Sequence, residues 1–160
     1  MHIDYDAEII PGASLGGISL NDSIYQVLEC LDSSSIAYDT ETFTNFGYVF
    51  DRVIINQGTI GVTANEQGDV IGLWCSEGYT GGFDGRLYAG MTISKILERT
   101  KKQMCINGRL VLDAEYGLFY DIPEKYHGEY YDDIDHVSDL PIYMVLSDLH
   151  IADRNWWWGR

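Results

Sequence analysis

The sequence has few basic residues, and almost none in its first half. Its 160 residues hold 10 lysines and arginines against 25 aspartates and glutamates, a formal net charge of −15. Residues 1–85 contain 13 acids and one base, Arg52, whereas residues 86–160 contain 12 acids and 9 bases. Such a chain repels nucleic acids and anionic membrane surfaces and attracts basic partners at long range.

Paired cysteines and long apolar runs are also missing. Cys30, Cys75 and Cys105 are odd in number and form no CxxC pair, which argues against a disulfide framework or a zinc site and predicts reduced, partly buried thiols. No apolar run approaches the roughly 20 residues that a membrane-spanning helix needs. The first ten residues are acidic and unlike a signal peptide. We therefore expect a soluble cytoplasmic protein.

Sequence motifs of the common enzyme classes are absent. There is no GxSxG, Walker-type GxxxxGK[ST], HExxH or strand-bound GxGxxG motif, and the glycine-rich GASLGG at residues 12–17 lacks the lysine of a phosphate loop. Two acidic clusters offer the oxygen and imidazole ligands of a divalent cation. They are Asp132, Asp133, Asp135 and His136, and Asp148, His150 and Asp153. A small metal-dependent hydrolase is thus one alternative, although we predict no catalytic residue, cofactor or metal.

A capped helix that recurs is the clearest structural signal. Ser23 is a good N-cap, with Gln26 completing a capping box and apolar residues following at helical spacing to residue 31. Residues 88–97, YAGMTISKIL, align with residues 19–28, SLNDSIYQVL, and predict a second helix over 92–102. The chain is therefore expected to be one compact domain, with 1–80 and 81–160 as candidate half-repeats.

The strand pattern predicts an α+β fold, with antiparallel sheet packed on two short helices. Residues 36–43, 47–55, 59–64 and 70–75 predict a meander that lies on the first helix. Residues 110–113, 117–122 and 142–151 predict later strands. Asn107-Gly108 fits either a tight hairpin or the end of the second helix. The ending NWWWG, with Trp156–Trp158, fits a packed terminal strand or an exposed aromatic patch.

Tyrosines lie beside carboxylates in the acidic segment 126–139, YHGEYYDDIDHVSD. Ring faces attract cations, carboxylates bind arginine forks, and tyrosine is enriched in interface cores. The segment therefore suits a surface that binds lysines and arginines of another protein.

The opening IIPGASLGGISL, the recurring capped helix, the acidity and the size resemble a cytoplasmic immunity protein of a bacterial contact-dependent growth inhibition system. The resemblance covers mainly residues 9–31 and is greatest to the group whose toxins are metal-dependent nucleases. It implies a protein that binds one cognate toxin domain, one to one, and blocks it without chemistry of its own. In that group the sheet of the immunity protein grips a toxin hairpin by strand addition.

Charge supports this interpretation independently, because a nuclease is basic and an acidic inhibitor associates with it rapidly. We expect the contacts to come from carboxylates and aromatics of the N-terminal half and of the later acidic segment. The candidates are Glu66, Asp69, Glu77, Tyr79, Asp84, Glu129, Tyr131, Asp132 and Asp133. An inhibitor of another enzyme, outside any toxin system, would present the same acidic face and is a further alternative.

Overall fold

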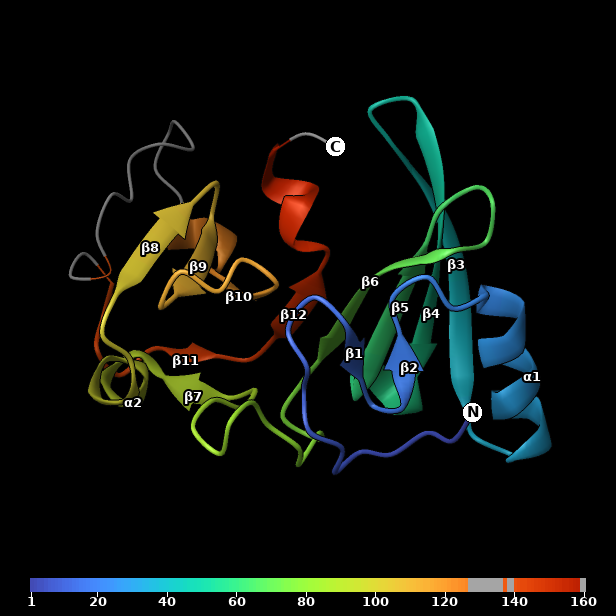
Figure 1. Ribbon diagram of the computed structural model, residues 1–160, viewed down its shortest axis with the longest axis horizontal. Coiled ribbons are helices and arrows are strands. Elements are labelled where there is room, and N and C mark those ends of the chain that lie inside the picture. The colour runs from blue at the N-terminus through green and yellow to red at the C-terminus, as the bar shows by residue number, and fades with distance from the viewer. Residues whose placement is uncertain (127–136, 138–139, 159–160) are drawn as a thin grey trace.

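The computed structural model describes residues 1–126, 137 and 140–158. Its main element is an antiparallel sheet of eight strands (Figure 1). In sheet order the strands are β3 (Tyr38–Asn45), β4 (Tyr48–Ile55), β5 (Ile60–Ala64), β6 (Val70–Cys75), β12 (Leu149–Ala152), β10 (Leu118–Asp121), β9 (Arg109–Leu112) and β8 (Gln103–Ile106). The predicted α+β class and the four-strand meander β3–β6 are confirmed.

Two helices and two small sheets complete the described structure. The helices are α1 (Ile24–Ser33) and α2 (Ile93–Arg99). One small sheet pairs β1 (Ser14–Leu15) with β2 (Ile18–Ser19), and the other pairs β7 (Met91–Thr92) with β11 (Val145–Leu146). Short 3-10 turns are η1 (Asn56–Gly58), η2 (Glu124–Tyr126) and η4 (Arg154–Trp158). No helix among the described residues is long and apolar enough to cross a membrane.

Both helices begin at the predicted caps. The Ser23 hydroxyl accepts a hydrogen bond from the Tyr25 amide at 3.3 Å, and the Thr92 hydroxyl accepts one from the Lys95 amide at 3.3 Å. α2 ends at Arg99, earlier than the predicted residue 102. The reason is Asp113, whose carboxylate accepts hydrogen bonds from the amides of residues 101 and 102 at 2.7 and 2.8 Å and holds them in an extended connection to β8.

The predicted hairpin alternative at Asn107-Gly108 is the one that forms. β8 and β9 pair directly across this turn, and both turn residues have positive φ, 50° and 75°. Two consecutive positive φ values define the hairpin turn whose twist matches the flanking strands, and glycine tolerates them without strain.

Two predictions for the C-terminal region are wrong. The single strand expected over 142–151 divides into β11 and β12, because Leu146 pairs with Met91 of β7 whereas Leu149 pairs with Cys75 of β6. The terminal strand expected at NWWWG is instead the 3-10 turn η4, in which the Trp156 ring stacks on Phe119 at a centroid distance of 5.8 Å.

The strand order is the same when it is followed outward from the centre in either direction. β6 and β12 pair antiparallel at the centre, each half continues with strands of decreasing sequence number, and the helices α1 and α2 precede the outermost strands β3 and β8. Figure 1 shows the two halves side by side, with α1 and α2 at opposite ends. A duplication of one strand-helix-sheet unit would produce this order, and the half-repeats stay a prediction.

The hydrophobic core lies on the face of the sheet that the helices cover. Ile24, Val27 and Leu31 of α1 and Ile93 and Ile96 of α2 share one buried cluster with alternate residues of the strands. All three cysteines are free thiols, as predicted, and burial raises the pKa of Cys75 to about 12. Because side chains alternate along each strand, the remaining residues point to the opposite, open face.

Candidate functional site

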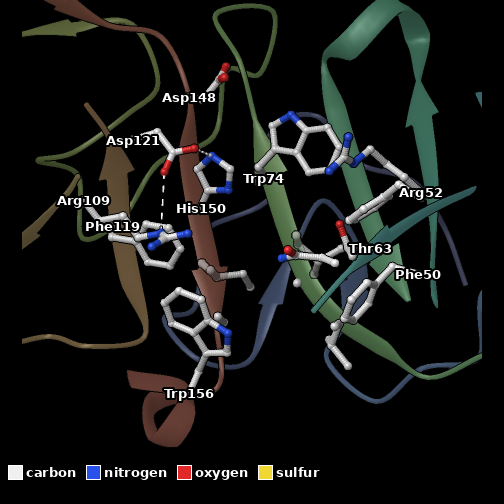
Figure 2. A pocket seen from close by; sticks show the side chains of 17 residues that line it. Phe50, Arg52, Thr63, Trp74, Arg109, Phe119, Asp121, Asp148, His150 and Trp156 are labelled. Atoms are coloured by element: carbon white, nitrogen blue, oxygen red, sulfur yellow. Dashed lines mark ion pairs between the residues drawn. The ribbon is translucent and has the colours of Figure 1, made fainter. Parts of the chain in front are cut away.

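The open face of the sheet carries a groove of about 500 Å³ across the centre, where the two halves join (Figure 2). We call it the sheet groove. Its wall and floor side chains come from β3, β4, β5, β6, β12, β10, β9 and η4. The residues that define it are Phe43, Phe50, Arg52, Thr63, Gly72, Trp74, Arg109, Phe119, Asp121, Asp148, His150, Ala152 and Trp156.

Small residues form the floor of the sheet groove. Thr63 of β5, Gly72 of β6 and Ala152 of β12 lie directly opposite one another in the strand register. A Cβ atom added at Gly72 would have no neighbour closer than the Ile151 carbonyl oxygen at 3.9 Å. The hollow therefore follows from the absence of large side chains in this row.

Aromatic rings line the adjacent row. Trp74, His150 and Phe119 are successive partners across β6, β12 and β10. The His150 ring is 21° from the plane of Trp74 and 6° from that of Phe119, and Phe119 is 7° from Trp156. The four rings thus form one nearly parallel series along the groove, which we call the aromatic row (Figure 2).

Arg52 lies at one end of the aromatic row. Its guanidinium carbon lies 4.4 Å from the Phe43 ring centroid and 5.5 Å from that of Trp74. Nη1 of Arg52 donates to Glu41 Oε1 at 2.6 Å, whereas its buried Nε has no hydrogen-bond partner among the described residues. The one base of the first 85 residues is therefore turned into the groove.

Arg109 occupies the opposite wall. Its guanidinium carbon lies 4.6 Å from the Trp156 ring centroid and 5.6 Å from that of Phe119. Its Nε is 3.8 Å from Asp121 Oδ1, an ion pair too long for a hydrogen bond. Both arginines thus lie against aromatic faces, a cation–π arrangement that fixes the guanidinium plane.

Two carboxylates border the groove. Asp121 Oδ2 lies 2.9 Å from Nε2 of His150, within ion-pair distance but without the geometry of a hydrogen bond. Asp148 is half-buried just before β12, and burial raises the pKa of its carboxyl, a shift that His150 opposes and Asp121 reinforces. The groove therefore combines stacked rings, cationic donors and carboxylate acceptors.

The predicted partner contacts are dispersed rather than gathered in one site. Glu66 and Asp69 are exposed on the turn between β5 and β6, where Glu66 accepts a hydrogen bond from the Val49 amide at 3.1 Å. Glu77 and Asp84 are exposed in the segment between β6 and β7, and Asp84 pairs with Arg86 at 3.0 Å. None of the four lines the sheet groove.

Tyr79, a predicted contact residue, is buried, with only 2% of its surface exposed. Its hydroxyl accepts a hydrogen bond from the Gly16 amide at 2.9 Å and donates one to the Ala7 carbonyl at 2.6 Å. Tyr79 therefore ties the N-terminal segment to the link between halves. The other predicted contacts, Glu129, Tyr131, Asp132 and Asp133, lie outside the described residues.

Of the two candidate metal clusters, only the second, Asp148, His150 and Asp153, lies among the described residues. Asp135 and His136 lie outside the described residues, as does the rest of that cluster. Asp148 and His150 of the second cluster both border the groove. In the part of the chain that the structure describes, no three His, Cys, Asp or Glu side chains are grouped so that they could hold a metal ion.

The hairpin β3–β4 presents an apolar tip next to Glu66, which accepts a hydrogen bond from the Val49 amide. Phe46 is 92% exposed, and Tyr48 and Val49 next to it are exposed as well. β3 is an edge of the eight-stranded sheet, so no strand among the described residues pairs with its outer side. An edge strand with an apolar tip is suited to pairing with a strand of another protein.

The groove does not follow from any of the sequence motifs. Its residues come from eight separate segments, and none of them forms a local motif. One signal was available: Gly61 and Gly72 interrupt two strands whose other positions are apolar or branched, and such glycines often mark a close approach. A Cβ at Gly61 would lie 1.9 Å from the Trp74 ring, so this glycine is what allows the indole to cover β5.

No family model matches the chain, and no curated protein matches it. Among solved structures, the fold is similar to the crystal structure of the uncharacterized protein yfeY from Escherichia coli, with a TM-score of 0.54 and 10% identity. The similarity covers 95% of this chain and 99% of that one. At this identity the likeness concerns the fold alone.

Proposed function

We propose that this protein is a cytoplasmic inhibitor of the immunity type, which binds and neutralises the basic nuclease domain of a contact-dependent growth inhibition toxin, one to one. The observation that carries the proposal is the surface of residues 1–85. Eleven of its 13 acidic residues are exposed, and its one base, Arg52, points into the sheet groove. This surface offers a basic partner many carboxylates, of which Glu41 and Asp84 are paired with Arg52 and Arg86.

The hairpin β3–β4 is the part of this surface best suited to contact. Its tip exposes Phe46, Tyr48 and Val49, and Glu66 is bonded to the backbone there. Aromatic side chains at the centre with charged residues around them are typical of protein interfaces. We infer that the partner contacts the tip and the free edge of β3, with acids around it guiding the approach.

The direct test is co-expression with the toxic C-terminal domain encoded immediately upstream, followed by affinity capture of one partner. The expected result is a one-to-one complex and survival of cells that carry both proteins. Absence of both a complex and protection would refute the proposal. If the protein instead binds and inhibits an enzyme that belongs to no toxin system, the alternative function as an inhibitor of another enzyme is favoured.

Charge reversal tests how the complex forms. Asp39, Glu66 and Asp69 are exposed, and replacing all three by lysine should lower the association rate about tenfold or more at low ionic strength, because steering depends on summed surface charge. Stopped-flow association at several salt concentrations measures this. Glu98→Lys with Glu124→Lys, exposed acids of the other half, is the control. If both sets of substitutions lowered the association rate equally, the acidic surface of residues 1–85 would not be what guides the partner.

A further inference from the structure

We propose that the sheet groove is a second binding site, one that takes a small planar heterocycle bearing an anionic group, in chemical class a nucleoside monophosphate. This site is separate from the acidic surface assigned to the protein partner. None of the exposed acids named for that partner lines the groove.

The aromatic row supplies stacking faces for a planar ring on the sides that the guanidinium groups of Arg52 and Arg109 do not cover. Trp74, His150, Phe119 and Trp156 lie nearly parallel along the groove (Figure 2). Nucleobases stack on such side chains in sheet-based nucleotide readers, because every base presents a π face. The floor beside the row is open, since Thr63, Gly72 and Ala152 are small.

The two arginines supply donors for an anion. Each guanidinium lies against aromatic rings. Nη1 of Arg52 already donates to Glu41 and Nη1 of Arg109 to the Asn107 carbonyl at 3.4 Å, so the remaining N–H groups are the donors for an anion. Arg52 has a buried Nε without a partner, and the Nε of Arg109 has only a long ion pair. A phosphate oxygen would satisfy donors that the described structure leaves unused, and burial makes such donors costly to leave so.

The carboxylates distinguish a heterocycle from a purely apolar anion. Asp148 is half-buried at the end of the groove next to His150, where an alkyl or aryl anion would gain nothing from it. A nucleobase carries N–H groups and a ribose carries hydroxyls, and both can donate to a carboxylate. Donors and acceptors in the groove therefore match a ligand with both kinds of group.

Size and charge restrict the ligand to a monomer. A groove of about 500 Å³ falls in the usual range of roughly 300–1,000 Å³ for small-molecule sites. A polynucleotide would have to approach a protein of net charge −15, with few phosphates neutralised in return. A mononucleotide brings about two negative charges and can enter between the two arginines.

The test is a titration of the full chain with AMP, GMP, CMP and UMP. Binding is monitored through the indole N–H signals of Trp74 and Trp156 in ¹⁵N-resolved NMR. We expect at least one nucleotide to shift the Trp74 signal saturably. Its nucleoside without phosphate, and ribose 5-phosphate without base, should each bind about tenfold more weakly or worse, since each lacks one of the two recognised parts. A fragment that binds as well as the nucleotide overturns the proposal, as does no shift with any of the four.

Variants locate the binding. Gly72→Leu fills the floor and should abolish the shift, whereas Gly72→Ala should retain it. Arg52 and Arg109 lie on opposite walls, so one phosphate contacts one of them, and one of the two variants Arg52→Gln and Arg109→Gln should weaken the nucleotide about tenfold and leave the nucleoside unchanged. Lys101→Gln, an exposed cation outside the groove, is the matched control. If Gly72→Leu does not fold, the two arginine variants test whether the nucleotide binds in the groove. Binding that is unaffected by all groove variants overturns the site.

The outcome does not depend on the protein partner. Phe46→Ser, at the exposed tip of the β3–β4 hairpin, should impair capture of the toxin domain and leave nucleotide binding intact. A chain that binds nucleotide without protecting cells would refute only the inhibitor proposal, and the reverse result would refute only the groove proposal.

Discussion

Trp74 covers β5 because Gly61 opposite it has no side chain, and Arg52 turns inward because Trp74 and Phe43 offer it aromatic faces. At the scale of single residues, the open face is thus decided by what lies across the strand rather than by neighbours in sequence. Asp148 is affected in the same way: its position beside a packed groove wall partly removes it from water.

The Asp148 carboxyl should make the protein less stable as pH rises from acid. Burial raises its pKa in the folded state above the value of about 3.9 for a free aspartate. Between these two pKa values the folded state binds a proton that the unfolded state has released, so the free energy of unfolding falls with rising pH. Asp148→Asn should remove this component and be the more stable protein at neutral pH. Urea unfolding at a series of pH values measures it, and parallel profiles of wild type and variant would contradict it.

At the scale of elements, the two helices show that a boundary can be set by a neighbouring residue or by a distant one. α1 begins where Ser23 caps it, and α2 ends just before the amides of residues 101 and 102, which donate to Asp113. The first of these features is encoded within four residues of sequence. The second depends on a carboxylate that is brought close by the β8–β9 hairpin, and no helical pattern contains it.

Loss of the α1 cap should be measurable. Ser23→Ala removes the acceptor of the Tyr25 amide and should lower the free energy of unfolding by about 1 kcal/mol, the usual contribution of an N-cap hydroxyl. Ser34→Ala is the matched control, because this exposed serine lies at the other end of α1 and surface changes of this kind stay within about 0.5 kcal/mol. Equal midpoints for the two variants in urea would show that the cap contributes little.

At the scale of the whole molecule, the pairing of β6 with β12 joins two similar halves into one sheet. Leu73 and Ile151 face each other across this central pair and are buried in the common core. The sheet groove lies on the other face of the same pair. Neither half contains the groove alone, so cooperative folding and the candidate site depend on the same contact.

A cavity at the central pair should therefore destabilise the entire molecule. Ile151→Ala should cost about 2–5 kcal/mol, the range for truncating a buried isoleucine. Tryptophan fluorescence and far-ultraviolet circular dichroism should shift to one common, lower midpoint. Ile142→Ala, at a position 61% exposed, should change stability by about 0.5 kcal/mol or less. Two separated transitions in Ile151→Ala would indicate halves that unfold independently.

Capping and side-chain alternation are local patterns, so the capped helices, the meander β3–β6 and the fold class could be predicted from the sequence alone. The charge asymmetry between the halves follows from composition. The burial of Tyr79, the division of residues 142–151 between two sheets and the packing of Trp156 on Phe119 depend instead on contacts between distant segments. The tertiary structure alone assembled the groove, because Arg52, Trp74, His150, Phe119 and Arg109 are far apart in the chain and adjacent only through strand pairing.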